Sequence, residues 1–268
     1  MKYNNIYNLK NKTSFVIGGL GLIGLECSIA LASFGSKVII IDNNKKEDAI
    51  KKINKKYGNN IFIENIDVSD LKNFKKNYSK LTKKYKIPDI FLNSSYPRTT
   101  DWGKNSFDNI NLETFEKNIS IHLNSFSWIA KIVADSMKKN KTGSIIQLGS
   151  IYGFMGQDIN LYKDLNSSEN MTYSIIKGGI INLTRQMASF YGKYNIRINT
   201  ISPGAIKNTN PKDLTNNKIF INRYVKKTPL NRIGKTSDVA SSVIFLSSDA
   251  SSYITGQNLI VDGGLSII

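Results

Sequence analysis

The chain has 268 residues, of which 40% are hydrophobic and 21% are charged, and it carries one cysteine, Cys27, and a formal net charge of +17. This length suits one globular domain, no apolar run approaches the roughly 18 residues of a membrane span, and a lone cysteine excludes an internal disulfide. The lysines are spread over many segments without an arginine-rich stripe or a nucleic-acid motif, so we expect no nucleic-acid partner; the charge reflects either a compositional bias or attraction of anionic small molecules.

Short apolar runs alternate with longer amphipathic stretches along the chain. The apolar runs are rich in Ile and Val, which is typical of strands covered on both faces, and predict strands at 14–17, 37–41, 61–66, 89–93, 143–148, 196–201 and 258–261. Helices are predicted at 22–34, 45–57, 71–85, 112–140, 171–191 and 237–247. This alternation predicts an α/β fold, a doubly wound parallel sheet of about seven strands flanked by helices, in a single domain over 1–268.

Two stretches, 95–110 and 205–235, lack a clear periodicity and carry Pro, Gly, Asn and Thr. We predict that both are loops at the edge of the sheet where the strands end, which is where ligands bind in such folds.

A glycine-rich turn follows the first predicted strand and opens the first helix. It consists of Gly18, Gly19, Leu20, Gly21, Leu22, Ile23 and Gly24. Glycines permit a tight turn and a close approach of the backbone to a pyrophosphate, and the helix N-terminus adds N–H donors. The turn therefore predicts a dinucleotide site.

An acid, Asp42, ends the second predicted strand 18 residues beyond Gly24, and Asn43 follows it. A carboxylate there accepts from both ribose hydroxyls of a dinucleotide and repels a 2′-phosphate, so the sequence favours NAD over NADP. Lys45 and Lys46 are a counter-signal, since they would pair with a phosphate. A solvated loop acid or a helix cap is the alternative for Asp42.

Polar residues also end the next two predicted strands. Asp67 and Val68 end the third, where the carboxylate would meet the adenine; a helix-capping role for Asp67 or Ser69 is the alternative. The fourth strand ends in small residues that let the backbone pass under the coenzyme, namely Asn93, Ser94 and Ser95.

Tyr173 and Lys177 are four residues apart in a predicted helix and so lie on one face, about one turn from each other. A cation that close favours the phenolate and lowers the pKa of the tyrosine, which makes Tyr173 a candidate acid/base. Ser150 ends an apolar run 23 residues earlier. Taken singly, each residue has an alternative reading: an ordinary serine at a strand end and an ordinary helix tyrosine.

With these residues assembled, the chain resembles the short-chain dehydrogenase/reductase family over essentially its whole length. The resemblance rests on the glycine turn and on Asp42, Asp67-Val68, Asn93-Ser94-Ser95, Ser150, Tyr173-x-x-x-Lys177, Asn199, Pro203-Gly204, Thr255-Gly256-Gln257 and Val261-Asp262-Gly263-Gly264. It implies a Rossmann-type fold and an NAD(P)-dependent oxidoreductase that acts on CH–OH groups.

The resemblance also implies roles for individual residues. Tyr173 is the proton donor or acceptor at the substrate oxygen, Lys177 lowers its pKa and holds the nicotinamide ribose, and Ser150 hydrogen-bonds the reacting oxygen. Near the nicotinamide the resemblance places Pro203, Gly204, Ile206 and Thr209, the last shifted by one position from the family's usual threonine.

The chain departs from the family pattern at several positions. Leu22 stands where the shorter members carry glycine, and His122 aligns with the helix asparagine that holds a water in the family's proton relay. The imidazole is expected to bond a backbone carbonyl and the water that reaches Lys177. A buried structural histidine is the alternative, and Asn118 or Asn124 would take the role in a shifted register.

The substrate side carries an extra polar segment. Ser150 and Tyr173 are separated by about ten residues more than is common in the family, and the insert around 154–170 includes Tyr162. We expect it to cover the mouth of the site, with Tyr152 and Tyr162 near the substrate and 205–235 as a lid. Arg98 is positioned to clamp a phosphate or carboxylate; a surface arginine is the alternative.

Residues 95–99, His122 and the run 151–153 also resemble oxidoreductases encoded with flagellin-glycosylation and nonulosonate (legionaminic-acid-type) sugar pathways. This implies an amino-sugar, sugar-nucleotide or sugar-phosphate substrate. A 3-oxoacyl-thioester reductase shares the coenzyme motifs, but Asp42 and the polar insert disfavour it. A non-catalytic dinucleotide-binding regulator is a further alternative, which the intact Ser150, Tyr173 and Lys177 disfavour.

The resemblance implies a homo-oligomer, a dimer or tetramer built on the helices 112–140 and 171–191 and the C-terminal strand. No apolar h-region follows the N-terminal residues, so we expect a cytoplasmic protein without a membrane partner. No metal site is predicted.

Overall fold

The computed structural model describes residues 3–44, 51, 53–55 and 60–268. The predicted helix 45–57 lies largely outside the described residues, as do Lys45 and Lys46. Among the described residues, no helix is long and apolar enough to cross a membrane.

Seven strands form one parallel sheet in the order β3-β2-β1-β4-β5-β6-β7, which confirms the predicted doubly wound α/β fold. In chain order the strands are β1 (Thr13–Ile17), β2 (Lys37–Asp42), β3 (Ile61–Asn65), β4 (Ile90–Asn93), β5 (Gly143–Leu148), β6 (Ile196–Pro203) and β7 (Asn258–Val261).

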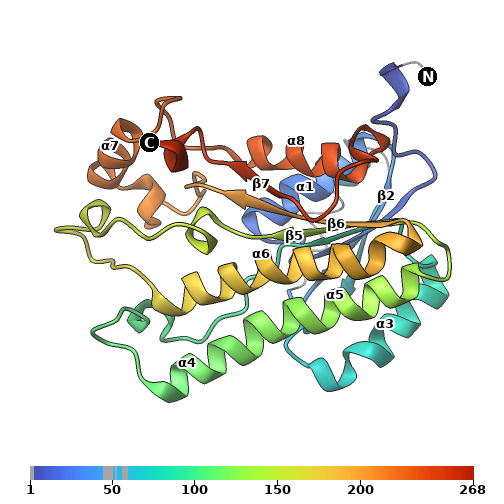
Figure 1. The fold of residues 1–268 in the computed structure, drawn as a ribbon, viewed down its shortest axis with the longest axis horizontal. Coiled ribbons are helices and arrows are strands. Elements are labelled where there is room, and N and C mark those ends of the chain that lie inside the picture. Colours follow the sequence, from blue (N-terminus) through green and yellow to red (C-terminus); the bar gives the residue numbers. More distant parts are fainter. Residues whose placement is uncertain (1–2, 45–50, 52, 56–59) are drawn as a thin grey trace.

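Helices cover both faces of the sheet (Figure 1). On one face lie α1 (Leu22–Ser33) and α8 (Thr236–Ser247), and on the other lie α3 (Leu71–Tyr85), α5 (Asn124–Met137) and α6 (Met171–Tyr191). Successive residues of β1 serve the two layers: Val16 joins the core under α1 and α8, while Phe15 and Ile17 join the core under α3, α5 and α6. Burial on both faces explains the continuous Ile/Val character of the strands.

The order of the strands reverses between β1 and β4. The chain therefore leaves the carboxyl ends of these two neighbouring strands in opposite directions. The backbone N–H of Ser94, just after β4, donates to the carbonyl of Ile17 at 2.9 Å, and that of Gly18 donates to Ile41 at 2.9 Å. Such a switch point is where open α/β sheets bind ligands.

Two parts of the chain differ from the sequence prediction. The single helix predicted over 112–140 is α4 (Leu112–Asn118), a π-helical turn (Ile119–Leu123) and α5 in succession. The loop predicted over 205–235 contains a helix, α7 (Lys218–Lys226). Its two buried residues, Phe220 and Tyr224, are one turn apart among lysines and asparagines, too short a pattern to stand out in sequence.

Cys27 is buried in α1, as expected for an inert structural thiol. Burial raises its pKa to about 12, so the reactive thiolate is not populated near neutral pH.

Candidate active site

The turn between β1 and α1 is closely packed. Gly18 has a left-handed backbone (φ +69°), and a Cβ there would lie 2.7 Å from the backbone of Ser95; a Cβ at Gly24 would overlap the carbonyl of Gly18. No side chain of the described residues caps α1 at Gly21, its N-cap. The first N–H groups of α1 are therefore left for an external anion, and the glycine cradle fits the pyrophosphate of a dinucleotide. All seven predicted residues lie here: Gly18, Gly19, Leu20, Gly21, Leu22, Ile23 and Gly24.

Asp42 ends β2 and faces this turn. Its Oδ2 accepts a hydrogen bond from the backbone N–H of Leu20 at 3.0 Å, and its Oδ1 accepts one from that of Asn44 at 3.0 Å. The carboxylate is buried rather than solvated, while Asn43 beside it is exposed. The side chain therefore lies at the end of β2, next to the glycine turn. This is the position from which a carboxylate would bind the ribose hydroxyls of a dinucleotide.

Asp67 follows β3 and bonds a near neighbour. Its Oδ1 accepts from the backbone N–H of Ser69 at 2.9 Å and from the Ser69 hydroxyl at 2.7 Å. The alternative that Asp67 or Ser69 caps α3 is wrong, because Asp70 is the N-cap and accepts from the N–H of Asn73. Asp67 is exposed and Val68 half-buried at this edge of the sheet.

The residues after β4 tie that strand to β1. The Ser94 hydroxyl donates to the carbonyl of Ile17 at 2.7 Å, and the Ser95 hydroxyl donates to Asn93 Oδ1 at 2.8 Å. Asn93 is fully buried, yet its Nδ2 has no partner among the described residues. A buried amide donor without an acceptor is costly, which is consistent with a ligand or water beside the turn.

Ser150, Tyr173 and Lys177 converge at the same edge. Tyr173 lies in the first turn of α6 and Lys177 one turn later, with Lys177 Nζ 5.5 Å from the centroid of the Tyr173 ring. Lys177 Nζ also donates to the carbonyl of Leu148, the last residue of β5, at 2.8 Å. Ser150 caps the short helical turn Ile151–Gly153, and that turn packs on α6 because Gly153 has no side chain to meet the Lys177 backbone.

The pKa values of this pair are set by burial. Burial raises the pKa of Tyr173 to about 12, with the Ser150 hydroxyl acting in the opposite direction, and burial lowers the pKa of Lys177 to about 7. The expectation that Lys177 lowers the pKa of the tyrosine is therefore not met in this structure, because the ammonium lies over the ring and loses its own hydration. At neutral pH Tyr173 is a neutral phenol that holds a proton to give.

His122 lies in the π-helical turn and is fully buried. Its ring packs edge-on against that of Tyr96, with the two centroids 5.3 Å apart. It packs in a tilted arrangement against the ring of Phe126, also at 5.3 Å between centroids. Neither ring nitrogen has a partner among the described residues, so the expected bond to a backbone carbonyl is not formed. Burial, with Lys177 nearby, holds the pKa of His122 well below its usual range, so the imidazole is neutral.

The two alternative asparagines lie elsewhere. The side chain of Asn118 already has partners in α4 and in the loop before it. Its Oδ1 accepts from the N–H of Thr99 at 3.0 Å, and its Nδ2 donates to the Thr99 hydroxyl and to the carbonyl of Thr114, both at 2.9 Å. Asn124 is exposed. His122, by contrast, lies within electrostatic reach of Lys177.

Two aromatic residues, Tyr96 and Trp102, pack beside Tyr173 although the sequence did not predict them there. The ring of Tyr96 lies 5.9 Å from that of Tyr173 and 5.7 Å from that of Trp102, and Trp102 lies 6.2 Å from Tyr173. Arg98 stacks over Tyr96 at 5.1 Å, so it stands at the mouth of the site. The only signal in the sequence was an aromatic residue directly after the Asn-Ser-Ser end of a predicted strand.

Beyond β6 the chain is tied to β7 and to the segment before α8. The N–H of Gly204 donates to the carbonyl of Val261 at 3.0 Å, and Ile206 forms a parallel bridge with Gly234. Pro203 ends β6. Thr209 is exposed, and its nicotinamide role stays a prediction.

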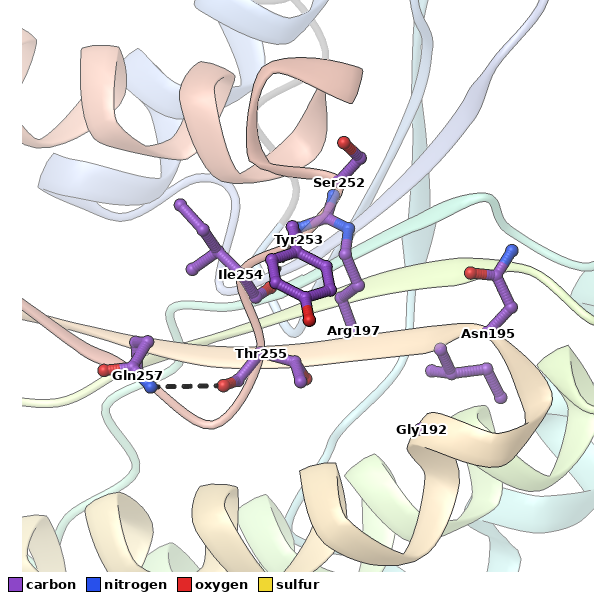
Figure 2. Close-up of a pocket in the computed structure, with 9 residues that line it drawn as sticks. Gly192, Asn195, Arg197, Ser252, Tyr253, Ile254, Thr255 and Gln257 are labelled. Atoms are coloured by element: carbon purple, nitrogen blue, oxygen red, sulfur yellow. Dashed lines mark hydrogen bonds between the residues drawn. The ribbon is translucent and has the colours of Figure 1, made fainter.

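The described residues hold no group of three or more His, Cys, Asp or Glu able to bind a metal ion. A hollow of about 620 Å³ lies at the opposite edge, around the start of β6 (Figure 2). Arg197 lines this hollow, and its guanidinium already has partners: it donates to the Ser251 hydroxyl and to the carbonyl of Leu246, each at 2.8 Å. Ligands in this fold bind at the carboxyl ends of the strands, so this hollow is not the active site.

Comparison with known proteins agrees with this geometry. A family model described as enoyl-(acyl carrier protein) reductase matches residues 21–266. The chain is 29% identical to post-translational flagellin modification protein A of Campylobacter coli, over 96% of this chain and 98% of that protein. It is 32% identical to the 3-oxoacyl-[acyl-carrier-protein] reductase FabG of Buchnera aphidicola, over 96% of this chain and 98% of that protein.

Solved structures extend the likeness. A short-chain dehydrogenase from Leptospira borgpetersenii with bound NAD+ is 30% identical, with a TM-score of 0.85 over 99% of this chain and 97% of that chain. A gluconate 5-dehydrogenase from Burkholderia cenocepacia in complex with NADP and tartrate shares the fold, with a TM-score of 0.86 at 22% identity over 98% of each chain.

The fold and the site define an oxidoreductase that acts on CH–OH groups with a nicotinamide dinucleotide. The chain belongs to the short-chain dehydrogenase/reductase family.

Proposed function

We propose that the protein interconverts a secondary alcohol and a ketone on a sugar, amino-sugar or sugar-nucleotide derivative, with NAD as the preferred coenzyme. The observation that carries the substrate class is the polar, cationic mouth. Arg98 stands over Tyr96 beside Tyr173, the turn after Ser150 adds the hydroxyl of Tyr152, and the insert adds that of Tyr162. These groups suit a substrate with several oxygens and a negative charge.

The proton chemistry follows from the pKa values. The coenzyme, when bound in the glycine cradle, exchanges a hydride with the substrate carbon. For reduction, the neutral phenol of Tyr173 donates its proton to the carbonyl oxygen, and the Ser150 hydroxyl hydrogen-bonds that oxygen. Lys177 stabilises the resulting phenolate, and its pKa of about 7 lets it return the proton at neutral pH. We assign His122 the next position in this proton route, beside Lys177.

NAD preference is supported by Asp42. Its carboxylate is held by the backbone of Leu20 and Asn44, so it cannot easily turn away from a 2′-phosphate. The rest of the proposed coenzyme site consists of residues at or after the ends of β2, β3, β4 and β6, namely Asn43, Asp67, Val68, Asn93, Ser94, Ser95, Pro203, Gly204, Ile206 and Thr209.

A basic hollow supports an anionic substrate. It has a volume of about 300 Å³ and lies between the insert and α7, where Lys163, Arg223, Lys226 and Lys227 line it. We propose that 205–235, with α7 at its centre, closes over the substrate as a lid.

A second candidate is a 3-oxoacyl-thioester reductase, favoured by the likeness to FabG of Buchnera aphidicola. The two are separated by thermal shift against sugar nucleotides, sugar phosphates and a 3-oxoacyl thioester with NAD+ or NADP+ present, followed by turnover of whatever binds. A shift and turnover with the thioester and NADPH alone would overturn the proposed substrate class.

We also propose that the protein is a cytoplasmic homo-oligomer, a dimer or tetramer. Apolar residues on α5 and α6 are about half exposed, namely Trp128, Ile175 and Phe190. Light scattering of the unaltered protein and of Trp128→Glu tests this, since a charge in the interface would dissociate the oligomer.

A further inference from the structure

Phenol groups gather between the insert and α7, next to Tyr173. Tyr162 Oη donates a hydrogen bond to Tyr152 Oη at 3.2 Å. Tyr224 Oη, on α7, accepts from the backbone N–H of Ala205 at 2.7 Å. Besides burial, the phenol of Tyr152 raises the pKa of Tyr173, so the two hydroxyls lie within electrostatic reach of each other.

Hydrogen bonds join the beginning of the insert to its end. Gln157 Nε2 donates to the carbonyl of Asn170 and to the Ser174 hydroxyl, both at 2.9 Å, and the N–H of Asn170 donates back to Gln157 Oε1 at 3.2 Å. This bidentate contact joins both ends of the insert to the first turn of α6. The position of Tyr162 is thereby fixed relative to Tyr173.

The insert is also held by α7 and by the residue that follows it. Asp164 pairs with Arg223 of α7 at 3.4 Å, and Asp158 pairs with Lys227, directly after α7. The ring of Tyr162 packs on that of Phe220 with centroids 6.2 Å apart, within a small apolar cluster. A side chain held from both sides keeps its hydroxyl in one place, which is what substrate recognition requires.

The hydrogen of the Tyr152 hydroxyl is the unmatched group. Because Tyr152 Oη accepts from Tyr162, its own hydrogen points elsewhere, and the described residues form no hydrogen bond with it. Tyr152 is half-buried, so water can accept from this hydroxyl when no ligand is bound. A ligand oxygen would satisfy it.

The chain connection places that oxygen near the reaction. The backbone N–H of Tyr152 donates to Ser150 Oγ at 3.2 Å, so the tyrosine is anchored to the serine assigned to the reacting oxygen. We propose that the Tyr152 hydroxyl, oriented by Tyr162, donates to a second substrate oxygen on the carbon next to the one that is oxidised or reduced. This inference rests on the proposed function and names its substrate class as vicinal diols and α-hydroxy ketones.

A matched pair of simple ketones tests this. Acetoin and 2-butanone differ by one hydroxyl on the carbon beside the carbonyl, and each would take a hydride from NADH or NADPH and a proton from Tyr173. The unaltered protein should prefer acetoin in kcat/KM. Tyr152→Phe should reduce that preference about tenfold, the effect of one lost hydrogen bond. Tyr162→Phe should reduce it about threefold, since it removes only the orienting donor.

Tyr253→Phe is the matched control, because this phenol is fully exposed at the opposite edge. It should leave the preference unchanged. Equal use of both ketones by the unaltered protein, or an unchanged preference in Tyr152→Phe and Tyr162→Phe, overturns the inference and leaves the oxidoreductase function in place. Failure to oxidise NADH or NADPH with either ketone or any sugar ketone counts against the proposed function, and the inference falls with it. If Tyr152→Phe does not fold, the preference measured in Tyr162→Phe decides.

Discussion

The Oδ1 atom of Asn170 accepts a hydrogen bond from the backbone N–H of Tyr173 at 2.8 Å, so the last residue of the insert caps the helix that carries the candidate acid/base. Asn170 Nδ2 also donates to the carbonyl of Trp102, at 3.2 Å. One amide therefore joins the insert, the aromatic wall of the site and the start of α6. A change in the insert reaches Tyr173 through the backbone.

Asn170→Ala should destabilise the protein by about 1 kcal/mol and reduce kcat, because the cap is lost and the first turn of α6 frays around Tyr173. Chemical denaturation and steady-state turnover measure the two effects. Asp70→Ala is the control, since Asp70 caps α3, a helix that carries none of the proposed catalytic residues, and should cost similar stability with kcat retained. An Asn170→Ala protein with unaltered kcat would contradict the coupling.

Tyr173→Phe should lower kcat by about a hundredfold to ten-thousandfold, the usual contribution of a positioned general acid, while the coenzyme still binds. Coenzyme fluorescence and absorbance at constant substrate separate the two quantities. The same substitution at Tyr253, on the opposite edge, should change neither. Full turnover in Tyr173→Phe would remove the phenol from the mechanism.

Because of Lys177, the free energy of unfolding of the protein without coenzyme should depend on pH. Its pKa is about 7 in the folded chain and near 10.5 when solvated. Between these values the unfolded chain binds a proton that the folded chain does not, so the free energy of unfolding rises with pH, by at most about 1.4 kcal/mol per pH unit for this group. Denaturation midpoints from pH 7 to 10 measure the slope.

Lys177→Met isolates this contribution, because methionine fills a similar volume and does not titrate. The slope between pH 7 and 10 should become smaller, and the variant should gain stability at pH 7 relative to the parent. Lys193→Met, at an exposed position beyond α6, should leave the slope as it is. Identical slopes for the parent and Lys177→Met would show that the ammonium is not desolvated.

Part of this site was readable from sequence and part was not. The strands, the glycine turn and the position of Asp42 beside that turn follow from local patterns, since a buried parallel strand and a glycine turn have a residue signature. The spacing of Tyr173 and Lys177 predicts that they are close but says nothing of burial, which is why the direction of the pKa of Tyr173 was wrong for this structure.

Long-range packing accounts for the other misses. Tyr96 and Trp102 come from the aperiodic stretch 95–110 and join the site only where the π-helical turn and α6 meet them. The ring of His122, in the π-helical turn, packs against Tyr96 and Phe126, and no local residue pattern signals these contacts. α7 gains its stability from the insert, which lies far from it in sequence.

His122→Ala should lower kcat and change the pH profile of kcat, because it removes the group that the proposed proton route places beside Lys177. His122→Asn should retain more activity, since an amide also offers a donor and an acceptor. Both variants lose ring packing, so equal melting temperatures with unequal pH profiles would separate the proton role from the structural one. An unchanged pH profile in His122→Ala leaves only the structural role.

Asp42→Asn tests coenzyme choice with minimal change in shape. The amide oxygen still accepts from the N–H of Leu20, but the negative charge is gone. A like charge at about 4 Å costs roughly 1 to 4 kcal/mol between water and a protein surface, so the kcat/KM preference for NADH over NADPH should fall about tenfold or more. Asp249→Asn removes an equal charge from an exposed position and should leave the preference unaltered, which excludes an effect of net charge. If the parent already prefers NADPH, or if Asp42→Asn keeps the full preference for NADH, the carboxylate does not select the coenzyme.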